Sequence, residues 1–427
     1  MSSSFDDSIE NSAAHDENVR SRCPHAMKIG CVIHSLDGGG AERVMAGLAS
    51  RLAMRQHDVE LITLDDGKHQ RHPLSERVKW LPLDVLSTEE RPVSIRTRLK
   101  RLRTAIDAGG YDVVLSFCDS TNLLVMMSTL LLRGRPPIVL SERSDPAHQT
   151  LGSAREWLRD RLYPRAEAVI GLSEDVAATL RSRMNVSPIV IPSAVEPPPH
   201  DYSRDRTTSA RQSIALPIGT PPPIRLIAIG RLEPEKGLTR LLEALATLNR
   251  NGTSQNWRLK ILGDGSELPR LRSFVVEHGI ESRVEFCGWV DSVWPLLAES
   301  DVFILPSHYE GFPSAMLEAM AGGLAVVAVD AGGGVRSVIR NGENALLVEN
   351  SSESLVEGIQ TILSDNLLRE RLASRAPEVC DRFGWEAMVD AYEEVLCRVC
   401  NRETDNPANP NPHDLEAHPP APSCVTQ

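Results

Sequence analysis

Residues 302–320 read VFILPSHYEGFPSAMLEAM, an apolar run followed by a loop and an amphipathic segment. The run from Val302 to Leu305 predicts a strand buried on both faces, and a helix is expected from Ala315 to Met320. Glu310 falls in the loop and Glu318 about one turn into the helix, so two carboxylates flank a helix N-terminus that favours an anion. Because carboxylates accept hydrogen bonds from sugar hydroxyls, the stretch predicts a site for a sugar joined to a phosphate.

Short apolar runs alternate with amphipathic helical segments through most of the chain. This alternation is typical of βαβ units, whose strands form a parallel sheet covered by helices on both faces. The expected strands form two series, at residues 28–34, 59–64, 78–83, 112–117, 137–140, 168–172 and 189–191, and then at 224–229, 258–262, 284–287, 302–305, 325–329 and 345–348. The pattern predicts an α/β fold with two doubly wound parallel-sheet domains.

A proline-rich segment separates the two series. Residues 192–223 contain two proline triplets around a charged stretch, which indicates a linker, with a short helix expected at 209–215. Parallel sheets bind ligands at the carboxyl ends of their strands, so two facing domains place a site in the cleft between them. The expected layout is a disordered tail at 1–26, a first domain at 27–195, a linker at 196–222, a second domain at 223–380, a helix at 381–400 that packs back on the first domain, and a disordered tail at 401–427.

The composition indicates a folded protein that does not bind nucleic acid. Its 427 residues are 41% hydrophobic and 24% charged, which suffices for the cores of two to three domains. The formal net charge of −12 has the wrong sign for a protein that coats a polyanion. The longest apolar run is about half the length of a membrane span, and the acidic start and scattered cysteines favour a cytoplasmic location.

A glycine triplet follows the first expected strand. Gly38, Gly39 and Gly40 precede a helix, so their amides and the helix N-terminus predict a phosphate contact, with a tight turn as the alternative. A nicotinamide-dependent oxidoreductase is a competing interpretation, because Asp65 after the second strand could hold a ribose hydroxyl. However, the dinucleotide fingerprint requires glycine where Arg43 stands.

Two cations follow the first strand of the second series. Arg231 and Lys236 lie on one strand-to-helix loop, where a planar fork and a compact charge could hold a diphosphate from two sides. A solvated pair of surface charges is the alternative. The next strand ends in the tight turn Gly263-Asp264-Gly265-Ser266.

Residues 27 to about 397 resemble the retaining, nucleotide-sugar-dependent glycosyltransferases of family 4, which have the GT-B fold of two Rossmann-like domains facing a cleft. The resemblance rests on Gly39-Gly40-Ala41-Glu42, on Ser141-Glu142-Arg143-Ser144-Asp145-Pro146, on Gly230-Arg231 with Lys236-Gly237, on Gly263-Asp264-Gly265, and on Glu310 and Glu318 with Gly311-Phe312-Pro313 between them. Phe383-Gly384-Trp385 resembles the start of the closing helix of this family.

The resemblance implies transfer of a hexose-type sugar from a nucleoside diphosphate to a glycan or lipid-linked acceptor in polysaccharide or glycolipid synthesis. UDP is favoured by family frequency and GDP is the alternative; no cofactor or metal is expected. The first domain would hold the acceptor and the second the donor. A catalytically silent sugar-nucleotide-binding protein is a further alternative.

The resemblance also assigns roles to residues. Arg231 and Lys236 would stabilise the leaving diphosphate, Glu318 would bind the ribose, and Glu310 would orient donor hydroxyls or act as a general base. The implied donor contacts are Gly39, Gly40, Gly263, Asp264, Gly265, Val290, Ser307, Gly311, Phe312, Pro313 and Glu318. Phe117-Cys118-Asp119 stands where many relatives have a histidine, which leaves the acceptor-side base unassigned.

A basic amphipathic segment extends from Arg91 to Arg103 in this acidic chain. Its cations, with Ile95, Leu99 and Leu102 at helical spacing, predict either a solvated helix face or a surface that docks on anionic lipid. Docking would place the protein at the inner face of the membrane.

Overall fold

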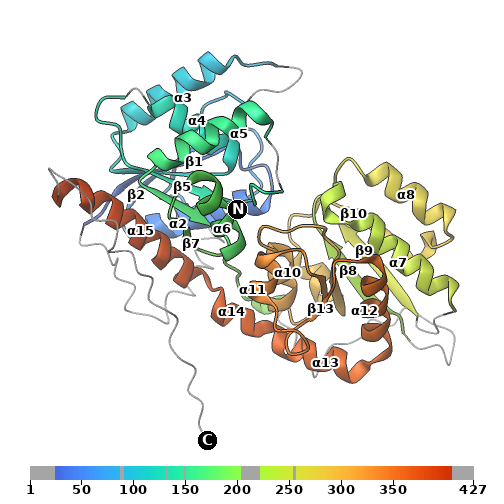
Figure 1. Ribbon diagram of the computed structural model, residues 1–427. Helices are drawn as coiled ribbons and strands as arrows, with labels where there is room; N and C mark the ends of the chain where they lie inside the picture. The colour runs from blue at the N-terminus through green and yellow to red at the C-terminus, as the bar shows by residue number, and fades with distance from the viewer. Residues whose placement is uncertain are drawn as a thin grey trace, which may run out of the picture.

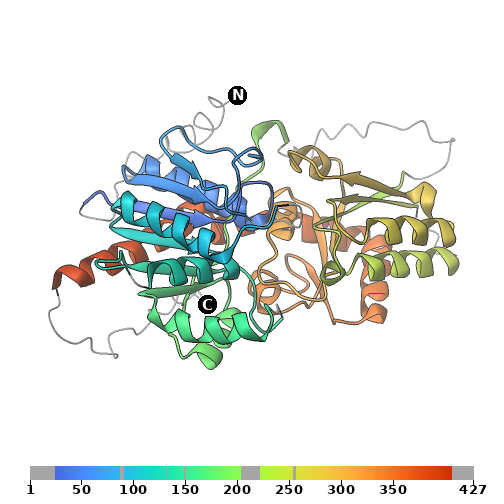
Figure 2. The same ribbon diagram turned by 90° about the horizontal axis from the view of Figure 1, so that it is seen from above.

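The computed structural model describes residues 25–405 with gaps at 87–90, 131, 149–150, 203–221 and 253–255. Two parallel α/β halves lie side by side (Figures 1 and 2). The predicted α/β class with two parallel-sheet domains is confirmed. The helix expected at 209–215, most of the linker and most of both tails lie outside the described residues.

The first half contains a seven-stranded parallel sheet in the order β3-β2-β1-β4-β5-β6-β7. The order reverses direction between β1 and β4, which creates a switch point at the carboxyl ends of these two strands. Its strands are β1 (Lys28–Ile33), β2 (Asp58–Thr63), β3 (Lys79–Pro82), β4 (Val113–Phe117), β5 (Ile138–Glu142), β6 (Ala168–Gly171) and β7 (Ile189–Val190). Its helices are α2 (Gly40–Met54), α3 (Ile95–Gly109), α4 (Asp119–Thr129), α5 (Ser153–Leu162) and α6 (Glu174–Met184).

The second half contains a six-stranded parallel sheet in the order β10-β9-β8-β11-β12-β13, with its switch point between β8 and β11. Its strands are β8 (Ile224–Ile229), β9 (Trp257–Leu262), β10 (Val284–Gly288), β11 (Val302–Leu305), β12 (Ala325–Val329) and β13 (Leu346–Val348). Its helices are α7 (Leu238–Arg250), α8 (Leu268–Glu277), α9 (Trp294–Ala298), α10 (Ser314–Ala321), α11 (Gly333–Val338), α12 (Ser352–Ser364), α13 (Asn366–Arg375) and α14 (Val379–Arg382).

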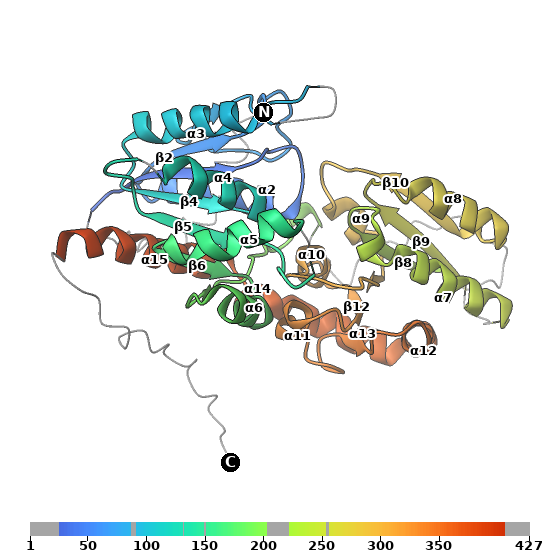
Figure 3. The ribbon, with the colours of Figure 1, turned by 45° about the horizontal axis from the view of Figure 1, so that its top comes forward.

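Each sheet is buried on both faces, because alternate residues of a strand point to opposite layers. In β12, Val327 packs with α7 and α12, whereas Val326 packs with α10 and α11 on the other face. In the first half, α2 covers one face and α3, α4 and α6 cover the other. Figure 3 shows these helix layers around both sheets. Strands covered in this way must be continuously apolar, which explains why the sequence predicts them well.

The last helix, α15 (Trp385–Asp405), packs on the first half although it follows the second in sequence (Figure 1). Val389, Tyr392 and Leu396 are fully buried in the same core as α2 and β1. α15 also contacts α2 and β4.

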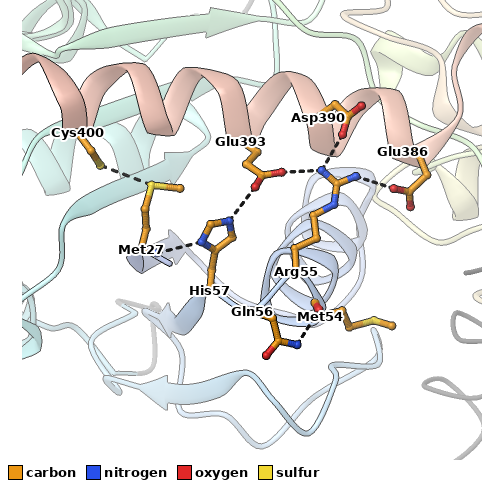
Figure 4. Close-up of polar contacts among 9 residues, drawn as sticks. All are labelled: Met27, Met54, Arg55, Gln56, His57, Glu386, Asp390, Glu393 and Cys400. Atoms are coloured by element: carbon orange, nitrogen blue, oxygen red, sulfur yellow. Dashed lines mark hydrogen bonds and ion pairs between the residues drawn. The ribbon is translucent and has the colours of Figure 1, made fainter. Parts of the chain in front are cut away.

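Polar contacts also attach α15 to the end of α2 (Figure 4). The Arg55 guanidinium lies 2.6 Å from Glu386, 2.7 Å from Asp390 and 2.7 Å from Glu393. The fully buried Glu393 also lies 3.1 Å from His57 Nε2, while His57 Nδ1 accepts a hydrogen bond from the Met27 amide. Because Nδ1 accepts a hydrogen bond, Nε2 carries the hydrogen and donates a hydrogen bond to Glu393.

Candidate active site

A cleft of ≈ 630 Å³ lies between the two halves. It is bordered by the start of α2 in the first half and by the loops after β8, β9 and β11 in the second. All of these segments follow the carboxyl end of a strand, where parallel sheets place their ligands. An adjoining hollow of ≈ 490 Å³ shares Lys236 and Glu310 with the cleft.

Lys236 and Glu310 are brought together from loops 74 residues apart. Lys236 Nζ lies 2.8 Å from Glu310 Oε1, and Ser307 Oγ donates to the same oxygen at 2.7 Å. The Glu310 side chain is only 8% exposed, so these two partners compensate for the loss of contact with water. The arrangement holds a cation and a carboxylate at the border of the cleft and the hollow.

The backbone at Gly237 explains why Lys236 can approach the loop after β11. Gly237 has φ of 65°, and a Cβ there would lie 2.0 Å from the Pro306 carbonyl oxygen. Only glycine accommodates this contact. Gly263, with φ of 124°, has the same function after β9, because its Cβ would lie 1.9 Å from the Gly230 carbonyl oxygen.

Arg231 is more exposed than Lys236. Its side chain is 71% exposed and its Nη2 lies 2.8 Å from Glu235 Oε1. It nevertheless borders both the cleft and the hollow. Arg231 is thus available at the entrance, while Lys236 lies deeper beside Glu310.

The remaining predicted donor contacts differ in their surroundings. Gly263, Asp264, Val290, Phe312 and Pro313 border the cleft, and Gly311 borders the hollow. Ser307 is buried and contacts Glu310. Gly265 packs on backbone, since a Cβ there would lie 2.5 Å from the Leu232 carbonyl oxygen. The predicted contacts thus include residues that line the cleft or the hollow, and two residues, Ser307 and Gly265, that hold the loops in place.

Glu318, in α10, faces the cleft and contacts the other half of the molecule. Arg43 Nη1 of α2 lies 2.6 Å from Glu318 Oε1. The Arg43 side chain is 27% exposed and that of Glu318 14%. From the sequence, Arg43 was noted only because it replaces a glycine of the dinucleotide fingerprint. No local sequence pattern predicts its contact with a residue in α10.

The glycine triplet lies across the cleft from α10. A Cβ on Gly40 would lie 3.7 Å from Ser314 Oγ, and a Cβ on Gly39 would lie 2.5 Å from Glu42 Oε2. The Gly39 amide donates to His72 Nε2 at 3.3 Å. Burial lowers the pKa of His72, which agrees with an unprotonated Nε2.

A second acid–histidine pair lies just behind the triplet. His34 Nε2 and Glu42 Oε1 are 2.9 Å apart. Burial opposes the charged form of His34, but the hydrogen bond and charge of Glu42, with the charges of Asp65 and Asp119, raise its pKa overall. Burial likewise opposes ionisation of Glu42, but the hydrogen bond and charge of His34 lower its pKa. The pair therefore favours an ionised contact that supports the start of α2.

Two further contacts across the cleft involve residues that the sequence analysis did not assign. The Arg71 guanidinium lies 4.2 Å from the centre of the Trp289 ring. The Tyr309 ring stacks on His148 at 4.5 Å, and its hydroxyl accepts a hydrogen bond from the Asp145 amide. These contacts link residues far apart in sequence, so spacing could not have revealed them.

A buried carboxyl group, Glu142, ends β5 behind the hollow. Tyr163 Oη donates to Glu142 Oε2 at 2.6 Å, and Ser144 Oγ donates to Oε1 at 3.3 Å. Burial, reinforced by the charge of Asp119, raises the pKa of Glu142 to about 7. Ser144 borders the hollow, so it connects the buried acid to the site.

Metal binding is not indicated by the described side chains. Within the described ranges, no three or more His, Cys, Asp or Glu side chains are arranged to hold a metal ion.

Two family models match the chain. The model for glycosyl transferases group 1 matches residues 217–379, and the model for glycosyltransferase family 4 matches residues 38–197. Each model covers less than half of the chain, and together they show that the chain is similar to glycosyltransferases of the family 4 type. The two matches correspond to the two sheets, and both models describe glycosyltransferases rather than oxidoreductases.

Named relatives of this glycosyltransferase cover nearly its whole length. A protein of Campylobacter jejuni named GalNAc-alpha-(1->4)-GalNAc-alpha-(1->3)-diNAcBac-PP-undecaprenol alpha-1,4-N-acetyl-D-galactosaminyltransferase is 27% identical over 384 residues, which are 88% of this chain and 99% of the relative. A D-inositol 3-phosphate glycosyltransferase of Acidothermus cellulolyticus is 27% identical over 397 residues, 84% of this chain and 86% of the relative.

Solved structures share the GT-B fold of this glycosyltransferase. Sucrose-phosphate synthase of Thermosynechococcus elongatus matches with a TM-score of 0.74 and 20% identity, over 88% of this chain and 100% of that one. HepE of Anabaena, solved with UDP-glucose, matches with a TM-score of 0.68 and 23% identity, over 87% and 100%. The predicted GT-B architecture is confirmed.

Proposed function

We propose that the protein transfers a sugar from a UDP-sugar to a lipid-linked or polysaccharide acceptor, with retention at the anomeric carbon. The contact between Lys236 and Glu310 carries this proposal, because it places a cation and a carboxylate together at the border of the cleft and the hollow. Support for UDP comes from the HepE structures with UDP and UDP-glucose, and support for the acceptor from the undecaprenol-linked name of the Campylobacter relative.

Breaking the bond to the diphosphate leaves a multiply charged group, and stabilising that charge is the main task of the site. Lys236 would place its ammonium group beside the leaving oxygen, and Arg231 would close on the diphosphate from the entrance. The first turn of α10 adds amides that favour an anion. The proposal requires no metal, because these groups are positively charged in place.

Glu310 would orient hydroxyls of the transferred sugar, and Glu318 would accept hydrogen bonds from the ribose. The departing diphosphate would itself take the proton of the acceptor hydroxyl on the same face, which gives retention without a protein nucleophile. A hexose-type sugar fits the resemblance that the motifs support.

The acceptor would lie in the hollow that adjoins the cleft. Arg143, Ser144 and His148 of the first half border it, opposite Tyr309 and Glu310. A lipid-linked acceptor would bring the first half to the inner face of a membrane, with the basic surface of α3 nearest the lipid. Within the described residues, every helix is too short or too polar to cross a bilayer.

A screen of nucleotide sugars tests this function. Thermal unfolding is followed with UDP-sugars, GDP-sugars and NADH, because a ligand at a hundred times its dissociation constant adds about 2.7 kcal/mol. We expect protection by a UDP-sugar, and release of UDP when an undecaprenyl-diphosphate-linked sugar is added. Protection by NADH alone would contradict the proposal, and donor binding without turnover on any acceptor would indicate a silent binding protein.

A further inference from the structure

The ion pair between Arg43 and Glu318 joins the two halves across the cleft. Arg43 lies in the first turn of α2, three residues after Gly40, and Glu318 lies on the cleft side of α10. Their oxygen and nitrogen atoms are 2.6 Å apart, and both side chains are largely shielded from solvent. The pair therefore occupies the carboxylate to which the proposed function assigns the ribose.

Arg43 has unused hydrogen-bonding capacity at this position. Its Nη1 contacts Glu318, whereas its Nη2 is buried and has no hydrogen-bond partner among the described residues. A buried guanidinium nitrogen without an acceptor is costly. Such a group indicates that an acceptor is supplied when the site is occupied.

Two other acids beside α2 are already engaged. Glu42 contacts His34 at 2.9 Å, and Glu196 contacts Arg51 at 2.5 Å. Neither of these carboxylates is left to Arg43. Arg43 borders the cleft, so a ligand bound there can supply the missing acceptor.

The groups around Arg43 define the chemistry of that ligand. The cleft also contains Arg231 and Lys236 on the opposite wall and the glycine triplet at the helix N-terminus. Cations on both walls beside a helix N-terminus suit a diphosphate, because guanidinium groups bind phosphate oxygens in pairs. The ribose that is attached to this diphosphate could bind Glu318 at the same time.

We propose that Arg43 is a third cation of the donor site. Glu318 holds Arg43 before the donor binds, and Arg43 moves to the diphosphate when the ribose hydroxyls bind Glu318. The inference rests on the proposed function and adds a binding residue from the first half. Donor binding then replaces the direct contact between Arg43 and Glu318 with a contact through the ligand, which Arg43 binds at the diphosphate and Glu318 binds at the ribose. The halves stay connected in both states.

The exchange predicts opposite effects on two probes, UDP and uridine. In Arg43→Met, Glu318 is free for the ribose, so uridine binds about 2–5-fold more tightly, which corresponds to the loss of a partly exposed ion pair. The same variant lacks the cation for the diphosphate, so UDP binds about 10–100-fold more weakly. Arg43→Lys keeps a positive charge and recovers part of the UDP affinity.

Calorimetry on the full chain measures both dissociation constants, with uridine determined by competition against UDP. Arg96→Met, on the exposed surface of α3, is the matched control and should bind both probes as the wild type does. If Arg43→Met binds UDP and uridine more tightly by the same factor, Arg43 only competes with the ribose. If it binds both more weakly by the same factor, Arg43 only orients Glu318. Either result overturns the proposal that Arg43 moves from Glu318 to the diphosphate. If the wild type binds neither UDP nor a UDP-sugar, the proposed function itself fails.

Discussion

Glu310 Oε1 has two partners, the ammonium group of Lys236 and the hydroxyl of Ser307. This single oxygen fixes the position of the lysine at the border of the cleft and the hollow. A lysine held by a poorly exposed carboxylate has a fixed direction, which suits the stabilisation of a leaving diphosphate.

Replacing Lys236 by Met should lower kcat by about 10²–10³-fold, because one preorganised charge at the leaving group is lost. Lys260→Met is the matched control, since Lys260 also forms a lysine–glutamate pair, 2.9 Å from Glu299. Turnover of a UDP-sugar measures the effect, and urea unfolding verifies the fold of both variants. Wild-type turnover in Lys236→Met would remove the lysine from the mechanism.

Glu142 predicts a pH dependence of stability. Its pKa is raised to about 7 in the folded chain from an ordinary value of 4.5. The folded state therefore binds more protons between these pH values, and this carboxyl destabilises the fold progressively as the pH rises from 4.5 through 7. Below pH 4.5 the effect is absent.

Glu142→Gln should therefore stabilise the protein at pH 8, by about 1–3 kcal/mol, and change stability little at pH 4.5. The amide can still bond to Tyr163 and Ser144, because both hydroxyls can donate or accept. Urea unfolding at the two pH values measures the difference. An equal gain at both would show that ionisation of Glu142 is not the cause.

At the level of single elements, α15 depends on a buried ionic contact. Arg55 is 6% exposed and Glu393 is 0% exposed, so removal of the arginine takes a charged partner away from a fully buried carboxylate. Arg55→Met should cost about 3 kcal/mol of unfolding free energy.

Arg398→Met is the matched control on the same helix. Arg398 pairs with Glu394 at 2.8 Å on the exposed surface, and its loss should cost less than about 0.5 kcal/mol. Urea unfolding followed by circular dichroism compares the two. Similar losses would mean that burial of the Arg55 contact contributes nothing.

The structure changes the interpretation of the basic segment at 91–103. The helix α3 begins at Ile95, and Arg91 instead contacts Asp84 before it. Leu102 and Ile106 are buried against α4 and the sheet, so the apolar side of α3 belongs to the core. Leu102 and Ile106 are therefore not available to lipid, whereas Ile95 at the start of the helix is 48% exposed beside the cations.

Changing Arg96, Lys100 and Arg103 together to Glu should release the protein from anionic vesicles, with UDP affinity unchanged. Each cation near an anionic surface contributes about 1 kcal/mol. Co-sedimentation with phosphatidylserine vesicles at low and high salt measures the binding. Retention of the variant on the vesicles would reject the α3 surface as the docking site.

At the level of the whole molecule, the halves also meet where α6 faces α11. A Cβ added to Gly333 would lie 2.3 Å from the Asp175 carboxyl carbon. The exposed Asp175 side chain can turn away from a methyl group, but the larger side chain of Gly333→Leu should hold the halves apart and lower kcat about 10-fold or more, since small misplacements of reacting groups cost about 10²-fold. The affinity for UDP should fall less, because most of its contacts lie in the second half.

Shortening Asp175 to Ala in the same chain removes the clash and should restore part of the turnover. Steady-state kinetics of the single and double variants measure this. If the double variant is as slow as Gly333→Leu, the clash between the halves is not the cause.

The sequence predicted the strands and the loops that carry the motifs, because strands buried on both faces must be apolar and motif residues are close in sequence. It could not predict the partners of these residues across the cleft. Arg43 and Glu318 lie in different halves, and only the assembled fold brings them to 2.6 Å. Similarly, the apolar spacing of α3 is the same for a face that packs in the core and for one that contacts lipid. Only the packing of Leu102 and Ile106 near α4 shows that these two side chains belong to the core.

Because α15 completes the core of the first half, the backbone crosses between the halves twice, once after β7 and once before Trp385. Two covalent connections allow fewer rotations of one half relative to the other than a single flexible linker would. They also make the first half discontinuous in sequence, so a fragment ending at residue 195 would expose the surface that Val389, Tyr392 and Leu396 cover. Separate production of that half would require supplying α15 as a second peptide.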